Sequence, residues 1–413
     1  MATSGNADSD VKLKRSLSLS LLTLYGLGTM VGAGIYVLLG EAAGRAGMHT
    51  PIAFLLAALV VAPTALSFGE LSARFPKSAG EALYVRVGLD SSLLALIVGL
   101  LVVMAGTVSA ASIVVGSVGY IQSLVAIPSM AVIFLVVILL GGLAAWGITQ
   151  SVLVAAILAL VEIGGLLAVV IAGAPNVLDD PDFLSTAFLV GEMPAWNGIL
   201  AASILAFYAF IGFEDMVNVA EEVKKPERNL PLSILLALLL TTFLYVSVAT
   251  VAIATVPPDL LAASKTPLAL VFSTTTGWPI QILSLIGAVA AINGILIQIV
   301  MAPRVLYGLS RQHALPVFLG KVHPKTRTPL YATLIITGLV LTLALVFPID
   351  KLARWTALTA LIIFTLCNLA LIRIKVTQPE PPATLSLPLI VPILGLISSL
   401  GFLLVDVMRG LID

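Results

Sequence analysis

Long apolar stretches recur along almost the whole chain, and they constrain its fold more than any other feature. Of the 413 residues, 60% are hydrophobic and only 10% are charged, whereas a soluble domain carries about 25% charged residues. A helix needs about 20 apolar residues to cross a hydrocarbon core about 30 Å thick. About eleven stretches meet that requirement. The sequence therefore predicts an all-helical protein that crosses a membrane about eleven times.

The predicted spans leave no room for a soluble domain. The polar residues 1–18 before the first span are basic, but ten further spans follow and no clear cleavage site is present, which argues against a cleaved signal peptide. The spans are predicted over Leu19–Gly40, Pro51–Ala73, Ser92–Leu124, Met130–Ile148, Ser151–Gly173, Ala195–Ala220, Pro231–Val256, Pro279–Leu309, Leu330–Phe347, Ala353–Ile374 and Leu385–Met408.

Lysine and arginine are unevenly distributed over the connections between these spans. Short connections rich in these residues stay in the cytoplasm. With a cytoplasmic N-terminal tail in residues 1–18, 16 of the 21 basic residues lie inside, and the connection 174–194 has four acidic residues and no basic one, as an external loop can. The prediction is a multi-pass protein of the cell (plasma or inner) membrane, with an external C-terminus after eleven spans. Only Arg45, Lys265, Lys351, Arg354 and Arg409 would lie outside.

Composition excludes several other classes. Basic and acidic residues number 21 each, so nothing indicates a nucleic-acid partner. The one cysteine, Cys367, excludes a disulfide framework and a thiolate metal cluster. The three histidines, His49, His313 and His323, fall in polar connections. No metal site and no cofactor are therefore predicted.

The first span is rich in glycine, with four glycines within nine residues: Gly26, Gly28, Gly32 and Gly34. Glycine weakens a helix because it loses much conformational entropy on ordering. Gly28 and Gly32 also form a GxxxG pattern, which is typical of close helix packing. The density of glycines favours an interrupted helix over packing alone.

The sixth span contains Glu214 and Asp215 shortly after Gly212. A carboxylate at the centre of a membrane helix costs about 2.5–3.5 kcal/mol on insertion scales, so such acids usually face a bundle interior or a wet cavity. The alternative is that each hydrogen-bonds to a neighbouring helix. Because adjacent helical residues point about 100° apart, both acids are not expected to face one ligand.

Interruptions in the first and sixth spans indicate two five-helix repeats of opposite topology. The repeats would be residues 19–173 and 195–376, joined by the external loop 174–194 and followed by an eleventh helix at 385–408. Broken helices present amide N–H groups and carbonyls at mid-membrane, which suits a zwitterion. A channel would need repeated pore loops, and a membrane-embedded enzyme would need a constellation such as HExxH; neither pattern is present.

Four sequence motifs resemble a known family. GTMVGAGIYV is similar to a first-helix signature, and ALSFGELSARFPKSAGEALYV to the end of a second helix with the following loop. FYAFIGFEDMVNVAEEVKKPERNLP is similar to a sixth-helix signature, and RVLYGLSRQHALP followed by HPKTRTPL to the loop between helices eight and nine. Together they resemble the amino acid, polyamine and organocation permeases with the LeuT-type fold. Many of these relatives have twelve helices, one more than expected here.

This resemblance implies a secondary transporter, not an enzyme, that moves amino acids by alternating access and is either coupled to protons or an exchanger. Polyamines and cationic amines remain alternative substrates, with Glu214 as the acid that would receive them. In such relatives the substrate carboxylate meets amides of the first break and the ammonium meets carbonyls of both breaks. The implied substrate residues are Gly32, Ala33 and Gly34 for the carboxylate, Met30, Tyr208 and Ile211 for the ammonium, and Thr107 and Asn293 for the rest of the pocket.

Glu162 lies in the middle of the fifth span. A number of relatives have a lysine there that stands in for a sodium ion, so the charge is reversed in this chain. The resemblance therefore predicts that coupling uses a titrating carboxylate or a bound cation, with H⁺ as the coupled ion and Na⁺ as the alternative. Glu162 and Glu214 are the predicted coupling or gating residues.

Overall fold

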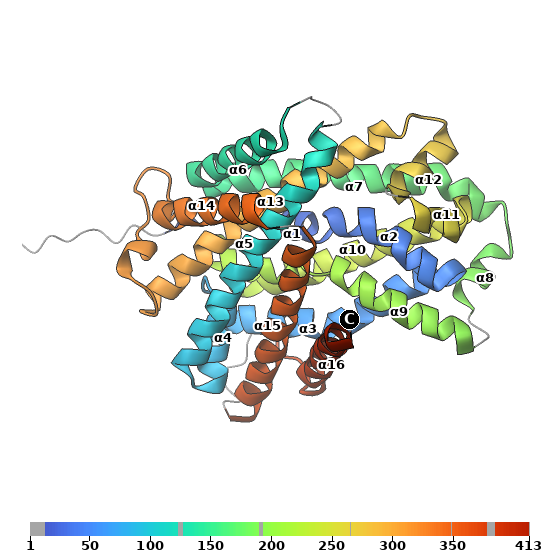
Figure 1. The fold of residues 1–413 in the computed structure, drawn as a ribbon. Helices are drawn as coiled ribbons and strands as arrows, with labels where there is room; N and C mark the ends of the chain where they lie inside the picture. The colour runs from blue at the N-terminus through green and yellow to red at the C-terminus, as the bar shows by residue number, and fades with distance from the viewer. Residues whose placement is uncertain are drawn as a thin grey trace, which may run out of the picture.

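The computed structural model describes residues 13–122, 127–189, 193–264, 266–347, 349–377 and 385–412, and they form an all-helical bundle without a named strand (Figure 1). Within these described ranges, nine helical segments are long and apolar enough to cross a membrane. Two shorter apolar helices, Leu330–Val346 and Ile390–Val405, account for the ninth and eleventh predicted spans. The prediction of a multi-span all-α protein is confirmed. The C-terminal end of the third predicted span, at Leu124, lies outside the described residues.

The helices are numbered in chain order (Figure 1), with η for 3-10 helices. They are α1 Leu19–Met30, α2 Ala33–Ala46, η1 Gly47–His49, α3 Thr50–Arg74, α4 Gly80–Leu89, α5 Ser92–Gln122, α6 Ser129–Trp146, α7 Ile148–Leu178, α8 Phe183–Phe188, α9 Met193–Ala209, η2 Phe213–Glu222, α10 Pro226–Thr255, α11 Pro258–Ala263, α12 Pro267–Thr276, α13 Gln281–Arg311, η3 Val317–Gly320, α14 Leu330–Val346, α15 Ile349–Thr377 and α16 Ile390–Ile412.

Both predicted interruptions are present. The first span divides at Val31 and Gly32 into α1 and α2, and the sixth divides at a turn that ends in Gly212, after which the chain continues as the 3-10 helix η2. Gly212 has φ 132°, a conformation that favours glycine. A Cβ on Gly212 would also lie 2.7 Å from Thr29 Cγ2. The absence of a side chain at Gly212 therefore lets the two breaks meet.

The two halves of the first broken helix, α1 and α2, lie in the middle of the bundle, with long helices around them (Figure 1). α1 packs against α7 and α10, and α2 packs against α9. Around this pair α3 runs along α10 and α5 along α13, which are the second and third helices of each predicted repeat. The arrangement places the backbone of both breaks inside the bundle, away from lipid, where protein groups, water or a bound ligand must satisfy it.

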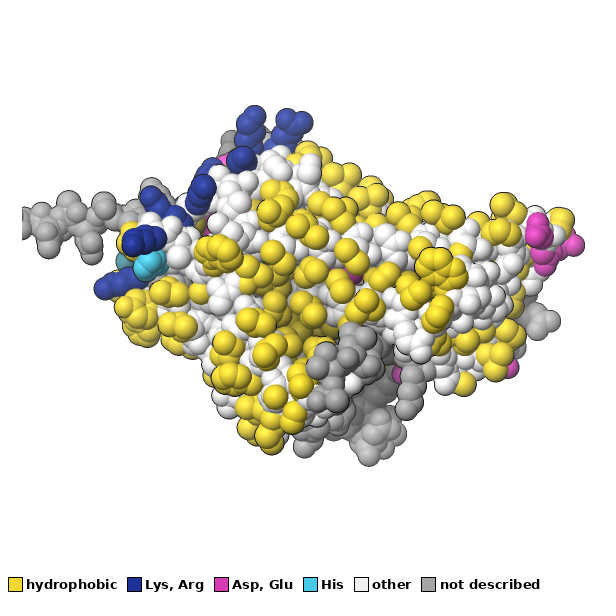
Figure 2. Space-filling view, turned by 90° about the horizontal axis from the view of Figure 1, so that it is seen from above, with side chains coloured by type: hydrophobic (Ala, Val, Ile, Leu, Met, Phe, Trp, Pro, Cys, Tyr) yellow, Lys and Arg dark blue, Asp and Glu magenta, His cyan; other side chains and the backbone are white. Residues whose placement is uncertain are grey.

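The two ends of the molecule differ in charge. Figure 2 shows lysine and arginine side chains gathered at one end and acidic side chains at the other. Exposed Lys77 follows α3, and exposed Lys224 and Lys225 precede α10, whereas exposed Asp179 and Asp180 follow α7. We call these the basic end and the acidic end. Their separation is the arrangement expected of a protein oriented by its basic connections.

The segment before α1 is attached to the basic end. The N–H groups of Ser16 and Leu17 donate to the Glu222 carbonyl at 2.9 and 3.0 Å, and the Lys224 N–H donates to the Leu17 carbonyl at 2.9 Å. Leu13 and Leu17 are buried in the bundle. The described part of the predicted N-terminal tail, residues 13–18, therefore binds to the end of η2.

Candidate functional site

A cavity of about 540 Å³ lies where the two breaks meet, among α1, α2, α5, α9, η2, α13 and α15. Its volume falls within the range of about 300–1,000 Å³ that is usual for small-ligand sites. Six residues predicted from the sequence line it: Met30, Gly32, Gly34, Tyr208, Ile211 and Glu214. The structure thus brings together residues from both repeats that are far apart in the chain, such as Met30 and Tyr208.

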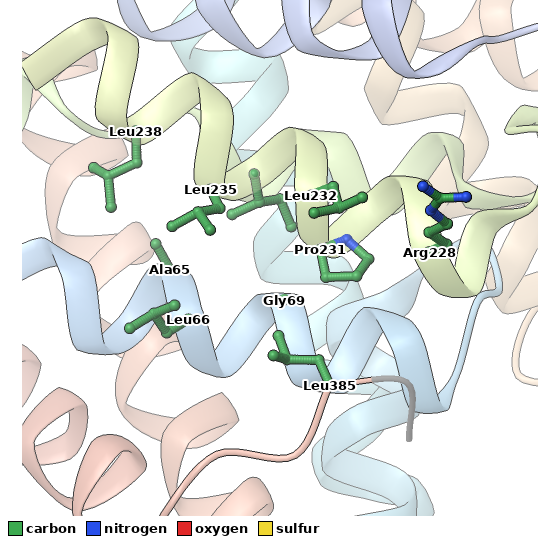
Figure 3. Close-up of a pocket in the computed structure, with 10 residues that line it drawn as sticks. Ala65, Leu66, Gly69, Arg228, Pro231, Leu232, Leu235, Leu238 and Leu385 are labelled. Carbon is green, nitrogen blue, oxygen red and sulfur yellow. The ribbon is translucent and has the colours of Figure 1, made fainter. Parts of the chain in front are cut away.

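A second cavity of about 290 Å³ lies between α3 and α10 (Figure 3). Its lining is almost wholly apolar, with side chains such as Leu66, Leu235 and Leu238, and Arg228 at one end. None of the predicted site residues lines it. The cavity at the breaks is therefore the candidate substrate site.

The first break presents a helix N-terminus to this cavity. α2 begins at Ala33, its N-cap residue Gly32 supplies no side-chain hydrogen bond, and both Gly32 and Gly34 line the cavity. The first N–H groups of a helix have no partner within it and carry a partial positive charge. The start of α2 is therefore suited to a carboxylate.

The carbonyls at the ends of α1 and α9 are joined by a residue that the sequence did not single out. The hydroxyl of Tyr245, on α10, donates to the Met30 carbonyl at 2.5 Å and to the Ala209 carbonyl at 3.1 Å. The Tyr245 ring packs edge-on against Phe54 and Phe210. The Met30 carbonyl, predicted to meet an ammonium group, thus already accepts one hydrogen bond and has one lone pair left.

Glu214 and Asp215 both line the cavity, contrary to the expectation that they would face different surroundings. That expectation assumed α-helical geometry, whereas the chain forms a turn and a 3-10 helix here. Each acid already accepts a hydrogen bond from within the protein. Glu214 Oε2 accepts from the Gly212 N–H at 2.8 Å, and Asp215 Oδ2 accepts from Gln298 Nε2 at 2.7 Å.

Glu162 and Asn293, predicted separately, form one pair behind the cavity. Asn293 Nδ2 donates to Glu162 Oε1 at 2.9 Å, and both side chains are fully buried. A Cβ on Gly28 would lie 2.5 Å from Asn293 Nδ2. Because Gly28 has no side chain, the Asn293 amide can pack directly against α1. Glu162 Oε2 and Asn293 Oδ1 have no hydrogen-bond partner among the described residues.

Residues 17–408, nearly the whole chain, match the amino acid permease family. The chain belongs to this family. It is 31% identical to the branched-chain amino acid permease BcaP of Bacillus subtilis, over 96% of this chain and 87% of that protein. It is 29% identical to a methylthioribose transporter of the same organism, over 94% and 87% of the two chains. It is 27% identical to the vacuolar cationic amino acid transporter 4 of Arabidopsis thaliana, over 90% and 65%.

As an amino acid permease, the protein is a transporter and not an enzyme, and its all-helical bundle agrees with the LeuT-type fold of that family. The break cavity is placed as transport requires, inside the bundle between the basic and acidic ends. The roles of individual lining residues remain predictions.

Thr107 does not line the cavity of this permease. Its hydroxyl donates to the Val103 carbonyl of its own helix. Gly106, Ser109 and Ser112 of α5 face the cavity instead. Because a residue on a helix points about 100° away from its neighbour, a shift of one position along α5 exchanges Thr107 for Gly106.

Between the cavity and the basic end, aromatic rings close the bundle. Phe68 of α3, Phe213 of η2 and Phe364 of α15 pack with ring centroids 5.3–5.6 Å apart. Further along η2, Glu222 forms a fully buried ion pair with Arg304 of α13, whose Nε lies 3.0 Å from Glu222 Oε2. This end of the permease is closed.

Proposed function

We propose that this permease carries a neutral amino acid, bound by its ammonium and carboxylate groups at the two helix breaks. The observation that carries the proposal is the cavity at which the N-terminus of α2 and the carbonyl ends of α1 and α9 converge. Leu38 and Ile113 add an apolar lining. Glu214 and Asp215 already accept hydrogen bonds within the protein, so neither acid requires a cationic side chain. The branched-chain permease relative supports the same substrate class.

Cationic amino acids and polyamines are the second candidate. Two acids in the lining and the likeness to a cationic amino acid transporter favour them. Thermal-shift screening of the purified protein separates the two classes because a ligand that binds only the native state stabilises it. We expect stabilisation by leucine, isoleucine or valine. Stabilisation by arginine, lysine or putrescine alone would instead establish the second candidate.

Alternating access is tested by counterflow in proteoliposomes. A carrier exchanges labelled external for unlabelled internal substrate and accumulates the label transiently, whereas a channel dissipates the gradient. We expect transient accumulation of the amino acid identified by thermal shift. Simple equilibration without overshoot would refute the carrier mechanism.

The Glu162–Asn293 pair is the proposed coupling site. Glu162 Oε2 and Asn293 Oδ1 each lack a hydrogen-bond donor among the described residues. A proton on Glu162 Oε2 would supply a donor at this site, and a bound cation could instead be coordinated by the same two oxygens. Proton binding at Glu162 linked to substrate binding makes substrate affinity depend on pH. Sodium is the alternative coupled ion.

Glu162→Gln resembles the protonated acid in size and charge. We expect this variant to retain substrate binding and exchange but to lose pH-driven accumulation, while Asp259→Asn, an exposed acid on α11, keeps the wild-type profile. An unchanged pH profile in Glu162→Gln would rule out the proton site. A sodium requirement that disappears with Glu162 would assign the site to Na⁺.

We further propose that the permease lies in the cell membrane with its basic end and N-terminus in the cytoplasm. The charge separation between the two ends supports this orientation. Cysteines at Lys225 and Asp180, each introduced into Cys367→Ala, should react with an impermeant maleimide from the cytoplasmic and external sides respectively. Labelling from the opposite sides would invert the proposed topology.

A further inference from the structure

A second carboxyl–amide pair lies outside the substrate cavity, at the junction of α4 and η2. Asn218 Nδ2, on η2, donates to Glu81 Oε1, on α4, at 2.9 Å. Both side chains are fully buried. The pair therefore joins the closed end of the sixth span to the short helix that follows the second span.

This pair leaves polar atoms without partners. Glu81 Oε2, Asn218 Oδ1, Tyr84 Oη and Ser78 Oγ are buried and have no hydrogen-bond partner among the described residues. An ionised carboxylate and an amide oxygen are both acceptors, so neither can satisfy the other. Leaving two such acceptors buried costs more than any single hydrogen bond returns. One proton on Glu81 changes this, because the acid then contributes a donor.

The surroundings of Glu81 oppose its negative charge. Burial raises the pKa of Glu81 to about 8, although hydrogen bonds from the backbone at Glu81 and from Asn218 oppose the rise, and charge on Glu214 adds to it. Asp215 of η2, Tyr84 of α4 and Cys367 of α15 also lie close enough to interact with a charge on Glu81. α5 carries no charged residue.

Arg304, a basic residue on the neighbouring helix α13, is already paired with a carboxylate. α13 also contacts α4, and its Arg304 is bound to Glu222 through Nε and Nη2. Arg86 of α4 and Arg373 of α15 are exposed, and both donate to backbone carbonyls. Among the described residues, the groups that interact with a charge on Glu81 are therefore acids, a tyrosine and a cysteine, none of which carries a positive charge. A proton is the simplest species that makes this contact neutral.

The contact that the pair bridges is tightly packed. A Cβ on Gly80 would lie 2.7 Å from Tyr84 Oη and 2.9 Å from Val217 Cγ2 of η2. On its other side α4 packs on α15, where a Cβ on Gly88 would lie 2.6 Å from Ala370 Cβ. A charge on Glu81 therefore has no room for hydrating water unless α4 and η2 separate.

We propose that Glu81 and Asn218 form a proton-binding site that holds the basic end of the permease closed, so that release of this proton favours opening of the contact between α4 and η2. The site is distinct from the proposed coupling pair at Glu162. The proposal rests on the transport function above, because a closed end has meaning only if it opens during transport.

The only cysteine in the sequence serves as the reporter. Cys367 lies on α15, is fully buried in the closed structure and faces the Glu81 region. The rate of its alkylation by N-ethylmaleimide is measured on the purified full-length protein between pH 6 and 8.5. The wild-type rate is divided at each pH by the rate in Glu81→Gln, which mimics the protonated acid. This division cancels the ordinary increase of thiolate with pH.

We expect the ratio of rates to rise at least tenfold from pH 6 to pH 8. The sign follows from linkage. A carboxyl whose pKa is higher in the closed form than in solution stabilises the closed form at low pH, and that stabilisation is lost as pH rises towards about 8. The equilibrium constant for opening increases by at most tenfold per pH unit. The matched variant Asp179→Asn, an exposed acid at the acidic end, should behave as wild type.

Other results would overturn the proposal. A constant ratio would mean that Glu81 does not control the gate. A falling ratio would mean simple repulsion between charged Glu81 and the thiolate, since repulsion slows only the wild-type protein. A ratio that changes when sodium is replaced by N-methylglucamine would mean that a metal cation is bound rather than a proton.

A second variant keeps the test decisive if Glu81→Gln does not fold. Asn218→Asp places two carboxyls side by side, and such pairs hold one proton more tightly. The rise in labelling should then move to higher pH, and an unmoved profile would refute the site. Because labelling requires no substrate, failure of the transport assays would count against the proposed function and would leave this result standing.

Discussion

Replacing Tyr245 by phenylalanine tests whether one hydroxyl organises both helix breaks. The change removes only the oxygen that donates to the Met30 and Ala209 carbonyls. The ring, which packs against Phe54 and Phe210, stays in place. Any effect can therefore be attributed to the two carbonyls and not to a cavity.

The expected magnitude follows from those two contacts. A buried polar group that loses its partner costs about 1–3 kcal/mol. The hydroxyl has one hydrogen to share between two carbonyls, and the residues Met30 and Ala209 line the cavity, so water can reach this region. We therefore expect the free energy of unfolding to fall by about 1–3 kcal/mol in total.

Tyr25→Phe is the matched control. Tyr25 is as fully buried, but its hydroxyl donates to a single carbonyl, that of Ile297, at 3.5 Å. Such a distance is at the limit of a hydrogen bond, so the loss should be below about 1 kcal/mol. Thermal unfolding of both variants gives the comparison. Equal destabilisation by Tyr245→Phe and Tyr25→Phe would refute the bridging role.

The same experiment reports on the substrate. With the hydroxyl removed, the carbonyls at the ends of α1 and α9 are left for the substrate ammonium. The amino acid should then raise the melting temperature of Tyr245→Phe more than that of the wild type. A smaller rise would mean that the ammonium does not use these carbonyls.

Two further predictions concern the breaks and the closed end. Gly34→Val should abolish uptake without loss of folding, since a Cβ there already lies 3.2 Å from Ala209 Cα. The control Gly164→Val, on α7, adds a side chain where no atom of another helix lies within 4 Å, and it should transport. Normal uptake by Gly34→Val, or its failure to fold, would contradict this. Arg304→Met should destabilise the protein by about 3–5 kcal/mol because it leaves Glu222 charged and buried. Adding Glu222→Met should restore most of that loss, as measured by thermal unfolding. Equal melting temperatures of the single and double variants would contradict this prediction.

The positions of the breaks could be predicted from the sequence because their cause is local. Glycines cluster at the first break, and Gly212 precedes two acids at the second, and these patterns are visible within a dozen residues. Partnerships across the bundle leave no such local trace. Glu162 and Asn293 are 131 residues apart, and Asp215 and Gln298 are 83 apart.

Other features of the site lack a distinguishing signal in the sequence. Tyr245 is one of two aromatic residues in a mostly apolar helix, so nothing marks it as the residue that bridges the breaks. Gly28 reads as half of a packing motif, yet its neighbour is the Asn293 amide. Glu81 lies in a loop motif whose importance appears only when Asn218 is placed beside it.

The backbone hydrogen bonds of Ser16 and Leu17 connect the segment before α1 to the end of η2. Two N–H groups hold the Glu222 carbonyl, on the residue whose carboxylate binds Arg304. Removal of these two residues would leave the Glu222 carbonyl without both donors. α16, by contrast, packs on α3 and α15, so its removal would leave these hydrogen bonds in place. A truncation before α1 therefore acts on the Glu222–Arg304 contact of η2, whereas a truncation before α16 does not.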